Sequence, residues 1–543
     1  MNNIFKKLKE SKKNLFVGVA GPGTGKSYTF KEIIESEEFK NRKILILSFI
    51  NKLVDDLSKE FEKFKNVRVS TLHAFAKQEL EKNIGDVDLD QDLDDIISED
   101  YFYLVKKNIN YGHKFCENNL DKDEEKFYKE RKDFYRYDKN LYSFNSIIHL
   151  FNIIFSKHES KIPKYDLILI DEFQDFNASE YELIKLLNKK TKIILVGDEN
   201  QSLYDFKKAV PNQIIDLYND ASTEEFSLDY CYRCTEVIVN ATNSLIENSI
   251  KLGLLKKSEK KFLYPEGNEQ KDKISSKYQK IDFIPSISGA LLIYQLAKNI
   301  KKDIKNIEKD DKKRILILAP NYLKQNIYEG LIAEGFNIVE FELFSNEECN
   351  NKKHKYIIDA FETLVKRKTD NLSLRKVLFL YLSDKEIIEI LEKDKKIWFS
   401  LDEEIKLKID KDIEIFKKVK SGKEKLSDDE LSRLNNVFNL KKLLSKLIKG
   451  FKPVMKNAIE IEMTTTMSSK GLSADFVYYV GVDDQNMLIE KKLTSQKVCE
   501  FLVGITRARE KITIISLWDK NPQILELIDK RYINTIDLDT SNQ

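Results

Sequence analysis

The chain has 543 residues, 41% of them hydrophobic and 34% charged, which is enough for several buried cores beneath a charged surface. Its formal net charge of only +2 excludes a uniformly basic nucleic-acid-binding protein, so any phosphate-binding surface must be local. Five cysteines are too few for a disulfide framework, and no apolar run is long enough for a signal core or a membrane span. We therefore expect a cytoplasmic protein.

The first pattern along the chain is LFVGVAGPGTGKS at residues 15–27. An apolar run of strand type ends in a glycine-rich loop, Lys26 and Ser27, and residues of helical spacing follow. This order predicts a phosphate loop in which Lys26 reaches the β- and γ-phosphates of a nucleoside triphosphate and Ser27 holds Mg²⁺. The backbone N–H groups expected to surround the phosphate oxygens belong to Gly21, Gly23, Thr24 and Gly25.

A second pattern, YDLILIDEFQD, spans residues 165–175. A continuously apolar strand ends at Asp171 and Glu172, and in a parallel sheet this end lies at the same edge as the phosphate loop. The pair predicts a site in which Asp171 holds Mg²⁺ through water and Glu172 orients and deprotonates the attacking water. The alternative is a solvated acidic turn after a strand.

The next strand pattern, KIILVGDENQSLYDF at residues 192–206, ends shortly before Gln201. An amide at this edge of the sheet can sense a γ-phosphate. Tyr204 and Phe206 can offer aromatic faces to unstacked bases, although packing in a core explains two such aromatics at least as well.

Residues 228–236 read LDYCYRCTE, where two interpretations compete. Cys231 and Cys234 form a CxxC pair of the kind found in zinc and redox sites, and Tyr232 and Arg233 lie between them. Zinc needs four ligands, and the other three cysteines are isolated in the sequence. The spacing therefore favours a role for the Tyr-Arg pair over a role for the sulfur atoms.

Further strand patterns at residues 314–319, 476–481 and 511–516 alternate with helical stretches, which predicts a second α/β layer without a second phosphate loop. Two other segments interrupt this plan. Residues 81–150 begin with the acidic run GDVDLDQDLDDIISED, which we expect to be a solvated loop or helix face. Residues 346–454 are mostly helical in their spacing.

These patterns, in this order, resemble the motifs of superfamily 1 helicases of the UvrD/Rep type. The resemblance also rests on ILILSFINK, STLHAFA, EMTTTMSSKGLSADFVYYVGV and FLVGITRAREKITI, which begin at residues 44, 70, 462 and 501. It implies an α/β fold of two RecA-like P-loop cores, each a parallel sheet flanked by helices, with two mainly helical insertions. The first core is expected at residues 1–80 and 151–240, the second at 241–345 and 455–543, and the insertions at 81–150 and 346–454.

The resemblance also implies roles for single residues. Tyr232 is expected to stack on adenine, and Arg233 to contact the γ-phosphate. Arg507 is similar to a second phosphate-contacting arginine, supplied by the other core, although alone it also fits a surface arginine at a helix start. Gly471 is expected to join the nucleotide-binding set. The expected catalytic residues are Glu172, Gln201, Arg233 and Arg507.

The implied activity is movement in the 3′→5′ direction on single-stranded DNA, or at a junction with duplex, with ATP and Mg²⁺. The strand is expected to stack on Phe49, Tyr204 and Phe206, while Thr71 and His73 touch its backbone. An alternative of another class is an NTP-switched DNA sensor that regulates a partner without unwinding. Ser473 replaces a family glutamate that contacts the ribose, and no adenine-reading glutamine motif is recognisable, so the preference for ATP stays open.

The short helical insertion and the stretch ILILAPNYLKQNIYEGLIAEGFNI also resemble the helicase subunit of Gabija-type anti-phage systems. This resemblance implies a separate nuclease partner of the OLD family. A stand-alone DNA repair helicase explains the same residues. The acidic stretch DVDLDQDLDD and the helices of 346–454 are the surfaces expected to meet such a partner.

Overall fold

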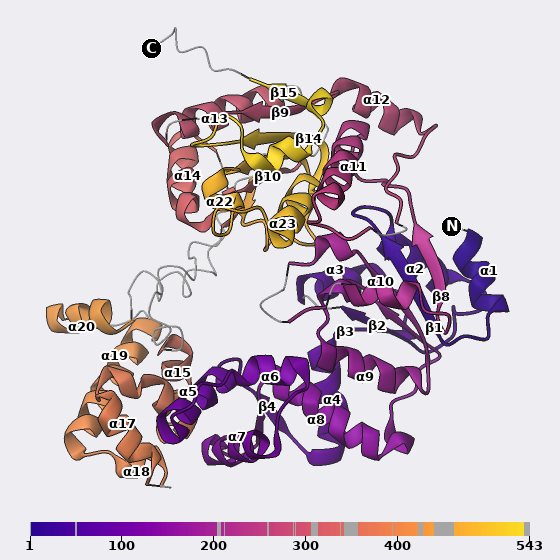
Figure 1. Cartoon of the computed structure of the whole chain (residues 1–543). Coiled ribbons are helices and arrows are strands. Elements are labelled where there is room, and N and C mark those ends of the chain that lie inside the picture. Colours follow the sequence, from indigo (N-terminus) through magenta and orange to yellow (C-terminus); the bar gives the residue numbers. More distant parts are fainter. Residues whose placement is uncertain are drawn as a thin grey trace.

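The computed structural model places three bodies side by side, with the second core at the top of Figure 1, the first core at the right and a helical body at the lower left. It describes residues 2–48, 51–203, 208–210, 212–257, 260–285, 287, 289–305, 313–336, 338–341, 357–393, 395–421, 427–438 and 461–536. Within these ranges, no helix combines the length and the apolar character that a membrane crossing requires.

Six parallel strands form the first sheet, in the order β3-β2-β6-β7-β1-β8. Their bounds are β1 Leu15–Ala20, β2 Ile44–Ser48, β3 Val67–Thr71, β6 Leu167–Ile170, β7 Lys192–Gly197 and β8 Glu224–Leu228. Alternate side chains enter opposite apolar clusters, as Phe16 and Val17 do, because successive residues of a strand point to opposite faces. The sheet is therefore buried on both sides.

Helices cover both faces of this sheet. One face carries α1 (Asn2–Glu10), α2 (Lys26–Glu35) and α3 (Asn51–Phe61), and the other carries α4 (Leu72–Ile84), α8 (Phe144–Lys157), α9 (Ala178–Asn188) and α10 (Asn212–Tyr218). The first half of α8, up to residue 150, was expected in an insertion. Its Ile147 and Ile148 are buried in the cluster of the first core, so this core resumes earlier in the chain than the sequence predicted.

The second sheet has seven parallel strands, in the order β11-β12-β10-β13-β14-β9-β15. They are β9 Ile281–Ile284, β10 Ile315–Leu318, β11 Ile338–Phe341, β12 Ile461–Thr464, β13 Ala474–Val480, β14 Ala508–Ile515 and β15 Ile533–Thr535. The surrounding helices are α11 Glu236–Lys251, α12 Glu269–Lys277, α13 Gly289–Lys305, α14 Asn321–Ala333, α22 Asp484–Met487 and α23 Ser495–Ile505. The predicted two-core α/β fold, with parallel sheets flanked by helices, is confirmed.

The helical body is built from both insertions. The first contributes α5 (Leu93–Val105), α6 (Tyr111–Glu117), α7 (Lys122–Tyr135) and the short parallel pair β4 (Val87–Leu89) and β5 (Asn140–Tyr142). The second contributes α15 (Ile357–Leu364), α16 (Asn371–Val377), α17 (Asp384–Leu391), α18 (Ile397–Ser400), α19 (Glu403–Ser421) and α20 (Asp428–Phe438). Apolar side chains of α5–α7 and α15–α19 share one buried cluster, so the two insertions form one folded unit.

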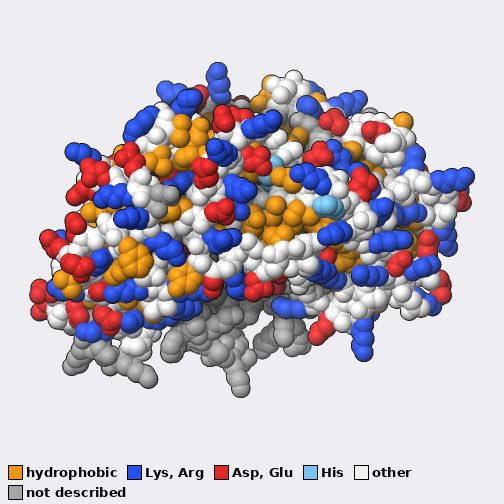
Figure 2. Space-filling model, turned by 90° about the horizontal axis from the view of Figure 1, so that it is seen from below, with side chains coloured by type: hydrophobic (Ala, Val, Ile, Leu, Met, Phe, Trp, Pro, Cys, Tyr) orange, Lys and Arg blue, Asp and Glu red, His pale blue; other side chains and the backbone are white. Residues whose placement is uncertain are grey.

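Much of the acidic run is buried inside this unit. Asp92 and Asp94 are 1% and 5% exposed. Lys376 of the second insertion lies 2.7 Å from Asp90 and 3.1 Å from Asp92, which neutralises the charge that the sequence suggested was solvated. The expectation of a solvated acidic face is wrong for these residues, because their partner lies far away in the sequence. From below, Figure 2 shows basic and acidic side chains interspersed, with small apolar patches between them.

Candidate nucleotide site

The phosphate loop joins β1 to α2. Gly23 and Gly25 have φ values of 69° and 88°, a left-handed conformation that glycine adopts without strain. A β-carbon at Gly23 would lie 2.3 Å from Cβ of Arg233, so a side chain there would displace that arginine. The Thr24 hydroxyl donates to the Gly21 carbonyl (2.9 Å) within the loop. The first turn of α2, which contains the partly buried Ser27, therefore presents backbone N–H groups to an anion.

Asp171 and Glu172 follow β6 directly and are 4% and 7% exposed. The alternative of a solvated acidic turn is therefore wrong. The ammonium nitrogen of Lys26 lies 2.9 Å from Oε1 of Glu172 and 3.9 Å from Oδ1 of Asp171. Burial raises the pKa of Asp171 to about 6. Burial also opposes ionisation of Glu172, but the charges of Lys26 and Lys470 outweigh it and hold the pKa of Glu172 well below its usual range.

Ser27 and Asp171 fit a Mg²⁺ site of the kind completed by a nucleotide. Such sites take one or two carboxylates, with phosphate oxygens and water as the other ligands. Among the described residues, no group of three or more His, Cys, Asp or Glu side chains could hold a metal ion by itself. We therefore expect these two residues to hold Mg²⁺ only together with bound phosphates.

Gln174, in the 3₁₀ turn η2 (Phe173–Asp175), fixes the orientation of Glu172. Its side-chain amide donates to Oε2 of Glu172 (2.5 Å), and its side-chain oxygen accepts from the backbone N–H of Asp198 (2.9 Å). Glu172 itself has φ 54°, a conformation that costs a residue other than glycine about 1 kcal/mol or more. The carboxylate is thus held in one strained position between Lys26 and Gln174.

Lys470 of the second core enters this site, and sequence reasoning did not single it out. Its side chain is 2% exposed and contacts Asp175, while its ammonium nitrogen lies 3.7 Å from Oε2 of Glu172 and donates to the Gln201 carbonyl (2.9 Å). The only sequence feature that could have pointed to Lys470 is its position next to Gly471. In the structure Gly471 is exposed and has φ 86°. A lysine between small residues and a strand is common on surfaces, so the pattern alone gave no reason to expect a buried one.

Gln201 lies where the two cores meet, in η3 (Glu199–Gln201). Its side-chain oxygen accepts from Nη2 of Arg507 (3.2 Å), and its amide donates to Oδ2 of Asp198 (2.6 Å). Arg507 is 2% exposed and also donates to the carbonyls of Val503 (2.9 Å) and Leu472 (3.1 Å). The alternative of a surface arginine is therefore wrong. We call the contacts of Lys470 and Arg507 with the first core the core seam.

Arg233 lies against the phosphate loop. The Cβ and side chain of Arg233 approach Gly23. The burial of Arg507, together with the positive charge of Arg233, lowers the pKa of Arg507. Two arginines, one from the loop after β8 and one from the second core, thus approach the same region. Two guanidinium groups that approach one region suit the negative charge of a phosphoryl group.

Tyr232 is 49% exposed, and its backbone N–H donates to the Gly23 carbonyl (2.9 Å), so its ring is available beside the phosphate loop. The two cysteines around it point inward and are fully buried. A hydrogen bond between the thiols lowers the pKa of Cys231 to about 6 and raises that of Cys234. The Cys234 thiol also donates to the Thr506 carbonyl (3.7 Å), which precedes Arg507 in the chain.

The predicted DNA-contacting residues are only partly described. Phe49, Tyr204 and Phe206 lie outside the described residues. Thr71 caps α4 by accepting from the backbone N–H of Ala74 (3.2 Å), a structural role that sequence reasoning did not assign. His73 lies 3.6 Å from Glu180 and edge-on to Phe144. Thr71 ends β3 and His73 lies in the first turn of α4, so both are at the carboxyl edge of the sheet.

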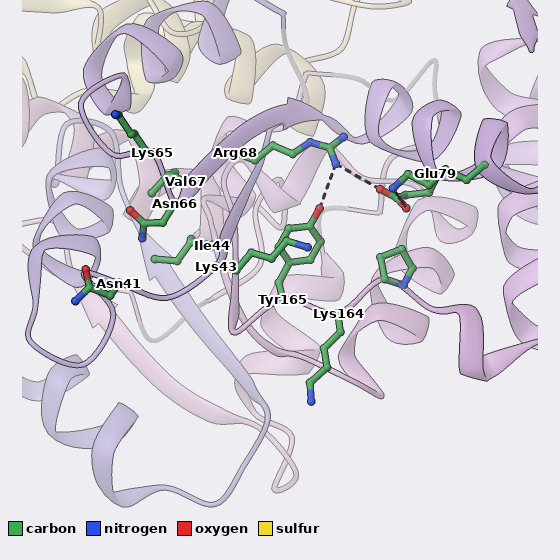
Figure 3. Close-up of a pocket in the computed structure, with 12 residues that line it drawn as sticks. Asn41, Lys43, Ile44, Lys65, Asn66, Val67, Arg68, Glu79, Lys164 and Tyr165 are labelled. Atoms are coloured by element: carbon green, nitrogen blue, oxygen red, sulfur yellow. Dashed lines mark hydrogen bonds and ion pairs between the residues drawn. The ribbon is translucent and has the colours of Figure 1, made fainter.

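A hollow of about 500 Å³ lies elsewhere on the first core (Figure 3). Its lining includes residues that precede β2, β3 and β6, among them Lys43, Lys65 and Lys164. Arg68 donates to the Tyr165 hydroxyl (3.1 Å) and to Glu79 (3.4 Å) across it. Because the nucleotide site follows the opposite, carboxyl ends of the strands, this hollow is separate from it.

Comparison with known proteins agrees with this geometry. A family model described as an AAA domain matches residues 6–207. ATP-dependent DNA helicase Rep of Buchnera aphidicola subsp. Acyrthosiphon pisum is 24% identical over 95% of this chain and 95% of its own length. A probable DNA helicase II homolog of Mycoplasma genitalium is 24% identical over 96% of this chain and 85% of its own. DNA helicase II of Escherichia coli is 41% identical over 88 residues, which are 16% of this chain and 12% of its own.

With the paired cores and the site between them, these matches establish that the chain is homologous, over most of its length, to the Rep and UvrD type of superfamily 1 DNA helicases.

Proposed function

We propose that this chain is an ATP-hydrolysing DNA helicase whose two cores close around one nucleotide and so move along single-stranded DNA. One observation carries the proposal: Lys470 and Arg507 of the second core reach Asp175, Glu172 and Gln201 at the nucleotide site of the first. A ligand at that site touches both cores, so binding and hydrolysis can change how they sit together.

Binding begins with an exchange of partners at Lys26. Its ammonium group now lies against Glu172, and phosphate oxygens in the loop compete for the same group. When Lys26 turns to the phosphates, Glu172 keeps its hydrogen bond from Gln174 and its ion pair with Lys470. The Glu172 carboxylate thereby stays ionised and oriented through Oε2, while Oε1 loses its contact with Lys26.

In this proposal Glu172 receives the proton of the attacking water. Its lowered pKa keeps it ionised at neutral pH, so its main contribution is to orient the water and to stabilise charge as the proton leaves. Ser27 and Asp171 would hold Mg²⁺ together with the nucleotide, and the ion would supply neutralising charge to the β- and γ-phosphates. Arg233 and Arg507 stabilise the negative charge that spreads over the transferred phosphoryl oxygens.

Gln201 links this chemistry to DNA. It contacts Arg507 through its side chain and Lys470 through its carbonyl, and the predicted stacking residues Tyr204 and Phe206 follow it closely in sequence. A strand that crosses both cores, past Thr71 and His73, is therefore expected to favour the closed arrangement. The 3′→5′ direction is part of this proposal and follows from the family resemblance.

Two assays on the purified chain test the proposal. We expect Mg²⁺-dependent ATP hydrolysis that rises when single-stranded DNA is added, and displacement of a labelled strand from a duplex with a 3′ single-stranded tail. A duplex with a 5′ tail is the matched control for direction. Stimulated hydrolysis without displacement on either substrate would favour the DNA-switched sensor instead.

A nuclease partner and a role in phage defence stay predictions. The acidic stretch proposed as one partner surface is largely occupied, because Asp90 and Asp92 pair with Lys376 inside the helical body. Charged groups on the outer face of α19, such as the Lys408–Glu404 pair, stay exposed and remain a surface to test.

A further inference from the structure

A five-residue segment between α11 and α12 contacts three elements around the nucleotide site. We call residues 260–264, which read KKFLY, the strap. It belongs to none of the motifs that identified the site. Its contacts reach the turn that carries Gln201, the phosphate loop, and the loop that carries Tyr232 and Arg233.

The first contact is made by Lys260. Its side chain is 4% exposed and lies against Asp198 and 3.2 Å from Glu199. Both carboxylates are nearly inaccessible, and among the described residues Lys260 is the only cation recorded within ion-pair distance of either. The other carboxylate oxygen of Asp198 accepts from Gln201, whose side-chain oxygen accepts from Arg507. A continuous polar chain therefore runs from Lys260 through Asp198 and Gln201 to Arg507.

The second and third contacts come from Phe262 and Leu263. A β-carbon at Gly21 would lie 2.7 Å from the Phe262 ring, so this ring packs directly on the phosphate loop. The backbone of Leu263 accepts from the N–H of Cys231 (2.8 Å) and donates to the carbonyl of Asp229 (2.8 Å). The strap thus holds the loop immediately before Tyr232 and Arg233. The cavity left between Lys260, Phe262 and α23 is only about 10 Å³, so the segment has little room to shift.

We propose that the strap is a positioning element for ATP hydrolysis, and that Lys260 acts through Asp198 and Gln201 to hold Arg507 in place. This inference rests on the proposed function. Lys260 is a positioning residue, because its contacts are with Asp198 and Glu199 and its effect on the phosphoryl group passes through Gln201 and Arg507. Misplacement of a transition-state contact by about 1 Å can cost about 100-fold in rate.

The test compares three substitutions in the full chain. Lys260→Met removes the charge and keeps the length of the side chain, Lys260→Arg keeps the charge, and Lys261→Met changes the exposed neighbour as a matched control. We expect Lys260→Met to lower kcat for DNA-stimulated ATP hydrolysis by about 10- to 100-fold, with KM changed less than about threefold. Lys260→Arg should recover most of kcat, and Lys261→Met should match the wild type.

A double-mutant cycle separates positioning from simple loss of structure. When Lys260→Met is combined with Gln201→Ala, kcat should fall by less than about threefold beyond its value in Gln201→Ala alone. Both substitutions break the same polar chain from Lys260 to Arg507. If Lys260→Met lowers the melting temperature, the same comparison is made with Glu199→Gln added, which removes one buried charge. A Lys260→Met enzyme with wild-type kcat, or losses that multiply, overturns the inference. A wild-type chain without ATP hydrolysis would overturn the proposed function instead.

Discussion

The helical body and the core seam are both places where distant parts of the chain meet, but they are held together differently. In the helical body, large apolar side chains from both insertions share one cluster, and Asp100, fully buried, accepts from Arg131 and Arg375 at 2.9 Å each. At the core seam the recorded apolar cluster is small, consisting of Leu203, Cys499 and Val503 with Leu255 beside them. Lys470 and Arg507 supply polar contacts there.

This difference predicts that a bound nucleotide can rearrange the polar contacts of the core seam but not the apolar packing of the helical body. Polar partners at the seam can be exchanged for phosphate oxygens with a small net change in free energy. Apolar surface in the helical body can separate only by entering water, at about 25 cal/mol for each Å² exposed. We therefore expect ATP to control the seam and to leave the helical body intact.

The largest expected effect comes from removing the second core's arginine. Arg507→Ala should lower kcat for ATP hydrolysis by about 10³- to 10⁵-fold, the range in which arginines that contact the transferred phosphoryl group act. The matched control is Arg509→Ala, because Arg509 is exposed and contacts Ser473. Steady-state ATPase assays on both variants measure the difference. Similar rates in the two would show that Arg507 only fills space at the seam.

Glu172→Gln should lower turnover by about 10²- to 10⁴-fold, because it removes the group that orients the water and receives its proton. Nucleotide affinity should stay near that of the wild type. In contrast, Lys26→Ala should lose affinity, since the ammonium group binds the phosphates. Equilibrium binding of a fluorescent ATP analogue, beside the ATPase rate, separates the two. Normal turnover in Glu172→Gln would contradict the assigned site.

Asp100→Ala tests the other side of the comparison. Removing this carboxylate leaves Arg131 buried without its carboxylate partner and Arg375 with Glu99 alone (3.2 Å), which should destabilise the helical body by about 3–5 kcal/mol. Hydrogen exchange of α5, α7 and α16 should report the loss, while the cores stay protected. Asp95→Ala, on the exposed side of α5, should cost less than about 0.5 kcal/mol. Equal exchange in all three proteins would mean that packing alone holds the body.

The smallest expected effect concerns the thiols next to Arg233. Replacing Cys231 and Cys234 together by serine should change kcat by less than about threefold, or about 0.7 kcal/mol in barrier. Stability should fall by about 1–3 kcal/mol, because hydroxyl groups enter a buried apolar cluster. Stoichiometric zinc in the wild type that disappears in the double variant would restore the metal interpretation of the CxxC pair.

The local parts of this molecule followed from its sequence. The phosphate loop and the Asp171–Glu172 pair each directly follow an apolar strand that is recognisable from neighbouring residues. Parallel strands then bring their carboxyl ends to one edge of the sheet. The two-core fold follows for the same reason, since the apolar strands at 314–319 and 476–481 are complete signals in themselves. Such patterns need no knowledge of distant residues.

What the sequence did not predict depends on distant partners. Helical spacing in 81–150 and 346–454 marked apolar faces, but it could not show that the two faces cover each other. Asp90 and Asp92 resembled solvated acids because Lys376 is more than 280 residues away. Lys470 and Lys260 were missed likewise: each is an ordinary lysine in a lysine-rich chain until the fold places it beside buried carboxylates.

The shared helical body also provides a second connection between the two cores. The chain leaves the first core after α4 and returns at α8, and it leaves the second core after β11 and returns at β12, so both excursions end in the same folded unit. The cores are therefore joined twice, once through the segment from β8 to α11 and once through this unit. A linkage closed in this way has fewer independent motions than a chain of hinged domains. We therefore expect the two cores to open and close along the same trajectory in each round of ATP binding and hydrolysis.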